Sequence, residues 1–139
     1  MKNYTTYEQA QKLVELGLSP DTSDLLYFIK PLTLYNIEEP LDVPNIPSLK
    51  GTMVETYIPK ECTHPCWSTT QLFKMFPKYI ELRGGVRYKL EVHTSQTDYV
   101  ITYYHPKHSS PLHISVKEDF SDAVYDMAVW WLEQDFLRT

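Results

Sequence analysis

The strongest pattern of apolar and polar positions lies near the C-terminus. Ten of the thirteen residues from Phe120 to Leu132 are apolar, and Asp119 precedes them as a helix cap. At 100° per residue, this segment forms a helix with two apolar faces. The first face holds Phe120, Ala123, Val124, Met127, Trp130 and Trp131, and the second holds Tyr125, Ala128, Val129, Leu132 and Phe136. Such a helix is either buried on two sides within its own domain or shares one face with another chain.

Regular alternation upstream predicts strands. The apolar residues Val86, Tyr88, Leu90 and Val92 alternate with Arg87, Lys89, Glu91 and His93, which is typical of a strand with one wet face. Gly84 and Gly85 suit a tight hairpin turn back to a strand at 79–82. Residues 98–104 predict the next strand, and Leu112, Ile114 and Val116 a short fourth one. We expect an α+β domain with an antiparallel three- to four-stranded meander and the C-terminal helix packed on its apolar face.

The first part of the chain predicts two more helices. Thr5 or Thr6 has capping-box spacing to Glu8 or Gln9, and Gly17 suits the end of an N-terminal helix. The apolar run at 25–29 predicts a buried strand, with helix as the alternative. Ser68 and Gln71 again have capping-box spacing, and Pro77 would end the short middle helix that they open.

Six of the ten prolines lie at about 31–65. Proline lacks a backbone donor and restricts the residue before it, so we expect this segment to be mostly irregular, with one short strand near 53–58. The segment either packs through its own apolar side chains or forms an arm that a partner binds. The length of 139 residues predicts a single globular domain over 1–139.

Composition favours a soluble, cytoplasmic protein. No apolar run approaches the roughly 18 residues of a membrane-spanning helix, and the N-terminus lacks the apolar region of a secretory signal. We therefore expect no membrane partner. The only cysteines, Cys62 and Cys66, cannot build a disulfide framework for a domain of this size, which agrees with a reducing compartment.

The net charge of −5 is unevenly distributed. Residues 74–108 carry six basic and three acidic side chains, so the middle is +3 and each end is −4. Arg83, Arg87, Lys89 and His93 would share the wet strand face with Tyr103 and Tyr104 nearby, an arrangement that resembles a small platform for single-stranded nucleic acid. Glu81 and Glu91 dilute this basic ridge, and mixed charge on an exposed strand is commoner as an aid to solubility. Nucleic acid is therefore the weaker alternative.

Thiol and imidazole groups that could bind zinc cluster in one segment. Cys62, His64 and Cys66 fall within five residues. A fourth ligand would come from His93, His105, His108 or His113, and the pair His105 and His108 could supply one or two. The spacing is not that of standard structural zinc sites. The alternative is a proline-containing turn in which the cysteines act as small apolar residues. Zinc, structural or hydrolytic, is thus the only cofactor that the sequence suggests.

Candidate catalytic groups do not form a set. His105, His108 and His113 could each act as a general base, but no nucleophile elbow, phosphate-binding glycine loop or zinc-protease motif accompanies them. Glu38 and Glu39 lie in the proline-rich segment, and the acidic residues at the start of the last helix suit its positive end. The sequence favours a non-enzymatic role.

Several short motifs resemble a group of small bacterial proteins of unassigned function that are associated with prophages and mobile elements. The matching segments are Glu8-Gln9, Leu13-Val14, Leu16-Gly17-Leu18, Pro65 to Leu72 with Pro77, Asp122 to Met127, and Trp131-Leu132. They cover both ends and the middle of the chain, whereas the proline-rich segment departs from the group. The resemblance implies a compact α+β domain and a mobile-element setting, without an activity or site residues.

We therefore expect a non-enzymatic interaction or accessory protein. Tyrosine and tryptophan, which are abundant here, concentrate at protein interfaces. The interface would use the second face of the last helix, at Tyr125, Val129, Leu132 and Phe136. The partner would be another protein or a second copy of the chain.

Overall fold

The computed structural model describes residues 3–28, 47–50, 62–82, 84–107 and 110–134. Its helices are α1 (Tyr7–Glu15), α3 (Thr69–Lys74) and α4 (Phe120–Glu133), with a 3₁₀ turn η1 at Pro20–Thr22. Its strands are β1 (Leu25–Phe28), β2 (Ser48–Leu49), β3 (Thr63–Cys66), β4 (Tyr79–Leu82), β5 (Val86–Thr94), β6 (Tyr99–Tyr104) and β7 (His113–Lys117). This content confirms the predicted α+β class.

The predicted meander is present as a four-stranded antiparallel sheet in the order β4-β5-β6-β7. The turn between β4 and β5 uses Gly84 and Gly85, which have φ angles of 87° and 79°. Only glycine adopts these angles readily, which explains the tight turn at this point. The hairpin predicted from the glycine pair is therefore confirmed.

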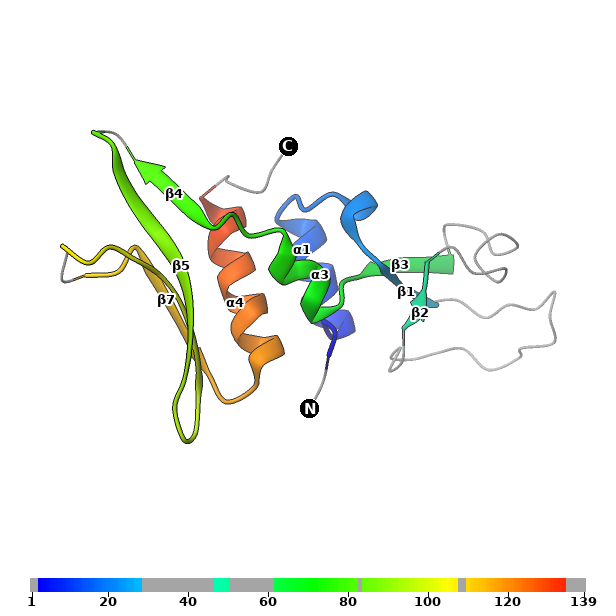
Figure 1. Ribbon diagram of the computed structural model, residues 1–139. Coiled ribbons are helices and arrows are strands. Elements are labelled where there is room, and N and C mark those ends of the chain that lie inside the picture. Colours follow the sequence, from blue (N-terminus) through cyan, green and yellow to red (C-terminus); the bar gives the residue numbers. More distant parts are fainter. Residues whose placement is uncertain (1–2, 29–46, 51–61, 83, 108–109, 135–139) are drawn as a thin grey trace.

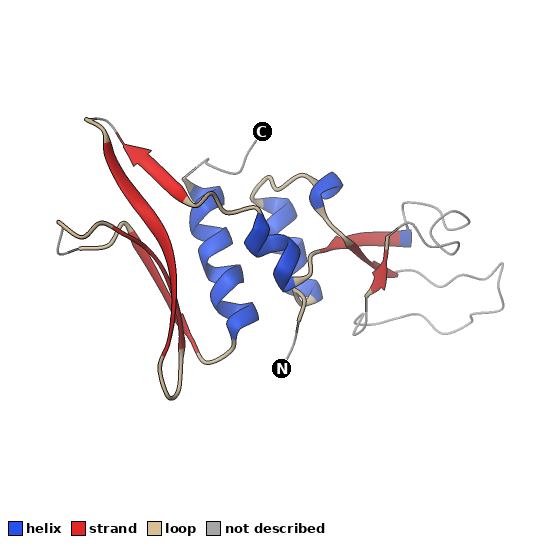
Figure 2. Cartoon of the chain, in the orientation of Figure 1, coloured by secondary structure: helices blue, strands red, loops and turns tan. Residues whose placement is uncertain are grey.

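The elements form layers that are clear in both ribbon views (Figures 1 and 2). The four-stranded sheet lies at one end, α4 covers its inner face, and α1 with α3 lies on the other side of α4. A second antiparallel sheet, of order β2-β1-β3, lies at the opposite end. The main core runs through the middle layers, from α1 and α3 across α4 to the inner face of β4–β7.

Helix α4 is buried on two sides within this arrangement. Ala123, Val124 and Met127 of its first face and Ala128 and Leu132 of its second face are all 0% exposed. The sheet and the other two helices thus cover α4 from opposite sides, as the layers show (Figure 1). Within the described residues the domain thus covers the first face and part of the second, where Tyr125 and Val129 stay partly exposed.

The helix caps follow the sequence with one exception. Of the two threonines, Thr6 caps α1: its Oγ1 accepts from the Gln9 N–H at 3.1 Å, and the Gln9 side chain accepts from the Thr6 N–H at 3.0 Å. Ser68 caps α3 by accepting from the Gln71 N–H, but the Gln71 side chain donates to the Thr22 carbonyl instead of completing the box. The second capping box is therefore only half formed, because Gln71 ties α3 to η1.

The smaller sheet contains the described end of the proline-rich segment, where the sequence predicted irregular structure or a turn. At the described end of that segment, Thr63–Cys66 is a strand paired with the predicted strand β1, and Pro65 lies opposite Leu26. Proline is tolerated because β3 is the last strand of its sheet, where a missing N–H costs little. The short strand expected near 53–58 lies outside the described residues.

No helix in the described part of the chain is long and apolar enough to cross a membrane.

Candidate functional site

The cysteine and histidine segment forms part of the small core instead of a turn. Cys66 is fully buried on β3, its thiol donates to the Thr5 carbonyl at 3.4 Å, and the Tyr27 hydroxyl donates to the same carbonyl at 2.7 Å. Burial raises the pKa of the Cys66 thiol to about 11. A buried, hydrogen-bonded thiol of this kind packs as a small apolar group in the core.

The other predicted zinc ligands make contacts of their own. The His64 ring packs edge-on against Tyr7 with 5.3 Å between ring centroids, and its Nδ1 lies 2.8 Å from the Pro65 carbonyl oxygen. His105 directly follows β6, and its ring packs against Tyr88 of β5 with 5.9 Å between ring centroids. The sheet that contains β5 lies at the opposite end of the molecule from β3 (Figure 1). His108 lies outside the described residues, and the ranges that are described contain no group of three His, Cys, Asp or Glu that could hold a metal ion. Zinc binding stays a prediction, which native mass spectrometry of protein purified without chelator would test.

The two cysteines should differ in reactivity. In the folded protein we expect a thiol reagent to label Cys62, which is half-buried, much faster than Cys66. At pH 8 a thiol of pKa about 11 is ionised to roughly one part in a thousand, and burial restricts access further. Mass spectrometry after timed labelling would show one fast site, with the second site appearing in denaturant. Equal rates at the two cysteines in native protein would contradict the buried position of Cys66.

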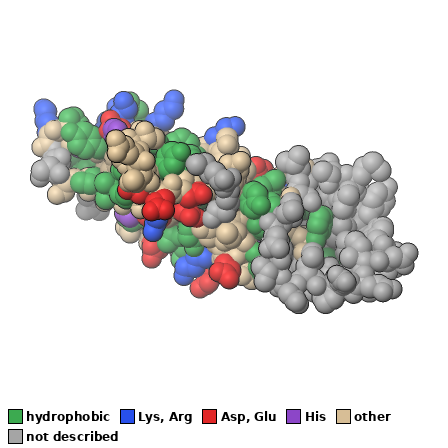
Figure 3. Space-filling model, turned by 90° about the horizontal axis from the view of Figure 1, so that it is seen from below, with side chains coloured by type: hydrophobic (Ala, Val, Ile, Leu, Met, Phe, Trp, Pro, Cys, Tyr) green, Lys and Arg blue, Asp and Glu red, His purple; other side chains and the backbone are tan. Residues whose placement is uncertain are grey.

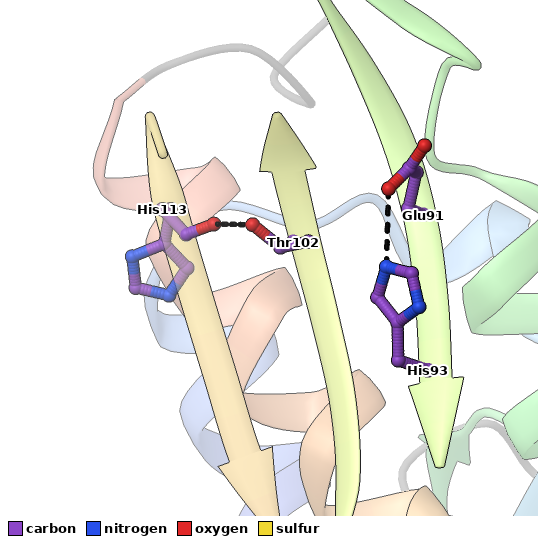
Figure 4. A network of polar contacts seen from close by, with 4 residues as sticks. All are labelled: Glu91, His93, Thr102 and His113. Carbon is purple, nitrogen blue, oxygen red and sulfur yellow. Dashed lines mark hydrogen bonds and ion pairs between the residues drawn. The ribbon is translucent and has the colours of Figure 1, made fainter. Parts of the chain in front are cut away.

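His113 connects β7 to α4. Its ring stacks on Trp130 with centroids 4.8 Å apart, its Nε2 lies 3.7 Å from the Asp126 carboxylate, and its carbonyl accepts from the Thr102 hydroxyl (Figure 4). Two residues along the strand, Ser115 is 1% exposed and donates to the Ala123 carbonyl at 2.9 Å. This serine is therefore bound to the helix and is no candidate nucleophile for a neighbouring histidine base. The geometry supports a structural role for His113.

Stability should fall as pH decreases below about 6.5. Burial lowers the pKa of both His64 and His113 from the ordinary 6.5, although Asp126 and Glu133 oppose the shift at His113. The unfolded chain then binds protons at a higher pH than the folded chain does, so the contribution is complete above 6.5 and is lost below it. Urea unfolding at pH 7.5 and pH 5 would measure the change, and replacing both histidines by glutamine should reduce it. Stability that is constant or higher at pH 5 would contradict this assignment.

The strand register defines a second face of the large sheet, which we call the outer face. Residues directly opposite one another in antiparallel strands point to the same side, and successive residues point to opposite sides. The side away from α4 therefore holds eleven residues. They are Tyr79 and Glu81 on β4, Arg87, Lys89, Glu91 and His93 on β5, Val100, Thr102 and Tyr104 on β6, and Ile114 and Val116 on β7.

The outer face has one charged half and one apolar half. On β4 and β5 the Arg87 guanidinium lies over the Tyr79 ring at 4.4 Å, and His93 Nε2 lies 3.0 Å from Glu91 Oε2 (Figure 4). On β6 and β7 the outward side chains are mainly apolar, and Ile114 and Val116 are 50% and 47% exposed. Figure 3 views this end of the molecule from the side and shows hydrophobic side chains there, with Lys and Arg side chains along one edge.

Strand β7 reverses the usual arrangement, in which apolar side chains point toward the core and polar side chains point to solvent. Its apolar residues Ile114 and Val116 point outward, while the polar residues His113 and Ser115 point toward α4. The contacts of Ser115 with Ala123 and of His113 with Trp130 hold this register. A shift of one residue would exchange the two sets, so the register chosen here leaves two large aliphatic side chains exposed.

The predicted site residues divide between this face and the core. Arg87, Lys89, Glu91 and His93 lie on the outer face, as their alternation predicted, with Tyr104 near them. Tyr103 is fully buried on the opposite side, so it is not available for base stacking, and Arg83 lies outside the described residues.

The helix residues predicted as an interface lie differently from what was expected. Leu132 is a core residue, and Tyr125 and Val129 are half-buried and pack against the core. Phe136 lies outside the described residues. This placement corrects the expectation that Leu132 belongs to a free face of the helix.

Sequence reasoning missed Val100, Ile114 and Val116 as surface residues. The alternation at 112–116 indicated a strand, but alternation alone cannot say which side meets the core. The one available signal was Ser115, whose small side chain allows a helix to approach closely.

Comparison with known proteins found no matching family model, no matching curated protein and no matching solved structure.

Proposed function

We propose that this protein is a non-enzymatic interaction protein whose docking surface is the outer face of the β4–β7 sheet. The observation that carries the proposal is the inversion of β7. Ile114 and Val116 are about half exposed, while Ser115 beside them is buried and hydrogen-bonded. Exposed clusters of apolar side chains mark sites of protein association more often than isolated ones do.

The chemistry of the face suits a protein partner. Its apolar half provides area that can be removed from water, and its charged half provides polar groups around that area, which is the usual arrangement of a protein interface. A polyanion needs several basic contacts without acidic neighbours, whereas Arg87 and Lys89 share this face with Glu81 and Glu91. We therefore favour protein over single-stranded nucleic acid.

Side-chain footprinting with hydroxyl radicals tests the proposal for any occupant. The protein would be labelled in native cell extract and, separately, as dilute purified protein. We expect Ile114 and Val116 to be protected in the extract. Val92 is the matched control, since it is 41% exposed but lies on the inner side of β5, and its labelling should not change.

Equal labelling of Val116 and Val92 in both samples would overturn the proposal. If nuclease treatment of the extract removes the protection, the occupant is nucleic acid, and the preference for protein is wrong.

A further inference from the structure

We propose that the occupant of the outer face is a second copy of this chain, packed face to face with its strands antiparallel to those of the first. This inference rests on the proposed function, since it names the partner of the same surface. Two observations support it, the charge balance of the face and the order of its cross-strand rows, and a third, the area of the face, sets the expected affinity.

The first observation is that the outer face is neutral on an acidic protein. It carries Arg87 and Lys89 against Glu81 and Glu91, whereas the whole chain has a net charge of −5. Two identical acidic molecules repel each other at long range, so they associate most easily through a face that has no net charge. A partner selected mainly by charge would instead favour a face with a clear excess of one sign.

The second observation is the order of two neighbouring rows across the sheet. One row consists of Glu91, Thr102 and Ile114, and the next of His93, Val100 and Val116. Consider two such sheets packed face to face, with a two-fold axis between them that runs perpendicular to the strands and midway between these two rows. This axis places the first row of one copy opposite the second row of the other. Self-complementary contacts of this kind are typical of symmetric dimers.

The contacts produced by this axis are chemically matched. Ile114 meets Val116 of the other copy, which covers the two aliphatic side chains that β7 leaves exposed. Glu91 meets His93 of the other copy, and the two-fold axis makes each contact twice. In the single chain Glu91 already lies 3.0 Å from its own His93, so the dimer would join two such pairs into one polar cluster.

The third observation is the size of the face, which sets the expected affinity. Four strands about 4.8 Å apart with outward residues about 7 Å apart give roughly 500 Å² for the whole face. The axis overlays only the part of the face on β5, β6 and β7, because β4 pairs with β5 outside the two rows. Stable interfaces usually bury about 800 Å² per partner, so we expect a weak, concentration-dependent dimer and not a permanent one.

Sedimentation velocity of the full chain over about 1 to 500 µM tests the inference in the concentration range where such a dimer would form. The wild-type protein should change from monomer to dimer. The double substitution Ile114→Lys with Val116→Lys should weaken the dimer by about 100-fold or more, because each change acts twice across the axis. The control Val92→Lys places the same charge on the other side of β5 and should leave the dissociation constant within about twofold. Circular dichroism and thermal melting of the dilute samples would establish that each variant is folded.

A charge exchange tests the row order itself. Glu91→Lys alone should weaken the dimer about tenfold, because it removes the acceptor that faces His93 of the other copy. Glu91→Lys combined with His93→Glu should restore most of the affinity, because the two substituted rows then face each other with opposite charges. If a dimer forms but none of the four outer-face substitutions changes its dissociation constant, the inference is wrong.

A wild-type protein that stays monomeric at every concentration would also overturn the inference. In that case the footprint distinguishes the two proposals: protection in extract alone would leave the proposed function standing with a different protein as partner. If Ile114 and Val116 are not protected in the extract either, both proposals are wrong.

Discussion

Replacing Leu132 by alanine should lower the free energy of unfolding by about 2–5 kcal/mol. Leu132 is 0% exposed on the second face of α4, in the core between the helices and the sheet, so the truncation leaves a cavity that the packed layers cannot close. Chemical denaturation of dilute monomer would measure the loss. The matched control is Ile114→Ala, which removes a 50%-exposed aliphatic side chain and should cost no more than about 0.5 kcal/mol.

The comparison of these two substitutions separates the two surfaces that could recognise a partner. If the second face of α4 were the interface, Leu132→Ala would have little effect on the monomer. A loss below about 1 kcal/mol would contradict the two-sided burial of α4. A large loss at Ile114 would contradict the exposure of β7.

Replacing Trp67 by alanine should destabilise the fold by about 3–5 kcal/mol. Trp67 is fully buried at the junction of β3 and α3, and its indole N–H donates to the Thr22 hydroxyl at 3.0 Å. Its carbonyl accepts from the Thr5 N–H at 2.9 Å, which ties the N-terminal segment to the end of β3. A typical domain has a stability of about 5–15 kcal/mol, so this single change should remove a large part of the total.

Trp67→Phe serves as the control for this prediction. Phenylalanine keeps an aromatic ring in the core and loses the hydrogen bond to Thr22, so it should cost clearly less than alanine does. Thermal melting of the two variants beside the wild type would measure the difference. If the two substitutions cost the same, the ring of Trp67 contributes little packing, and the structure around it is wrong.

The elements that local signals determine could be predicted from the sequence. Asp119 at the start of α4, the box of Thr6 with Gln9, and the glycine pair between β4 and β5 each act within a few residues, and all three are present. The sequence predicted where helix α4 lies along the chain but not what covers its two apolar faces, since the pattern fits burial on two sides as well as an interface.

Features that depend on distant contacts could not be predicted. Strand β3 contains Pro65 and forms only because β1 offers a pairing edge, so the composition of the segment gave the opposite expectation. Which side chains of β7 face the core depends on the contacts of Ser115 and His113 with α4, and a periodic pattern of apolar residues carries no information on these contacts. The candidate surface depends entirely on this direction, and the sequence therefore predicted its charged half and missed its apolar half.

The zinc hypothesis shows the same limit. Three suitable ligands within five residues look concentrated in the sequence, but β3 is extended, so alternate residues lie about 7 Å apart along it. Cys66 then points into the small core and bonds to Thr5, while His64 packs on Tyr7. Zinc binding by this segment stays a prediction.

The proposed dimer uses the outer face of the β4–β7 sheet and not α4. Backbone amide NMR spectra of the wild-type protein, recorded along a dilution series, would distinguish the two surfaces. We expect concentration-dependent shifts at Val100, Tyr104, Ile114 and Val116, with the amides of Tyr125 and Val129 unchanged. Shifts centred on Tyr125 and Val129, or spectra that do not depend on concentration, would contradict it.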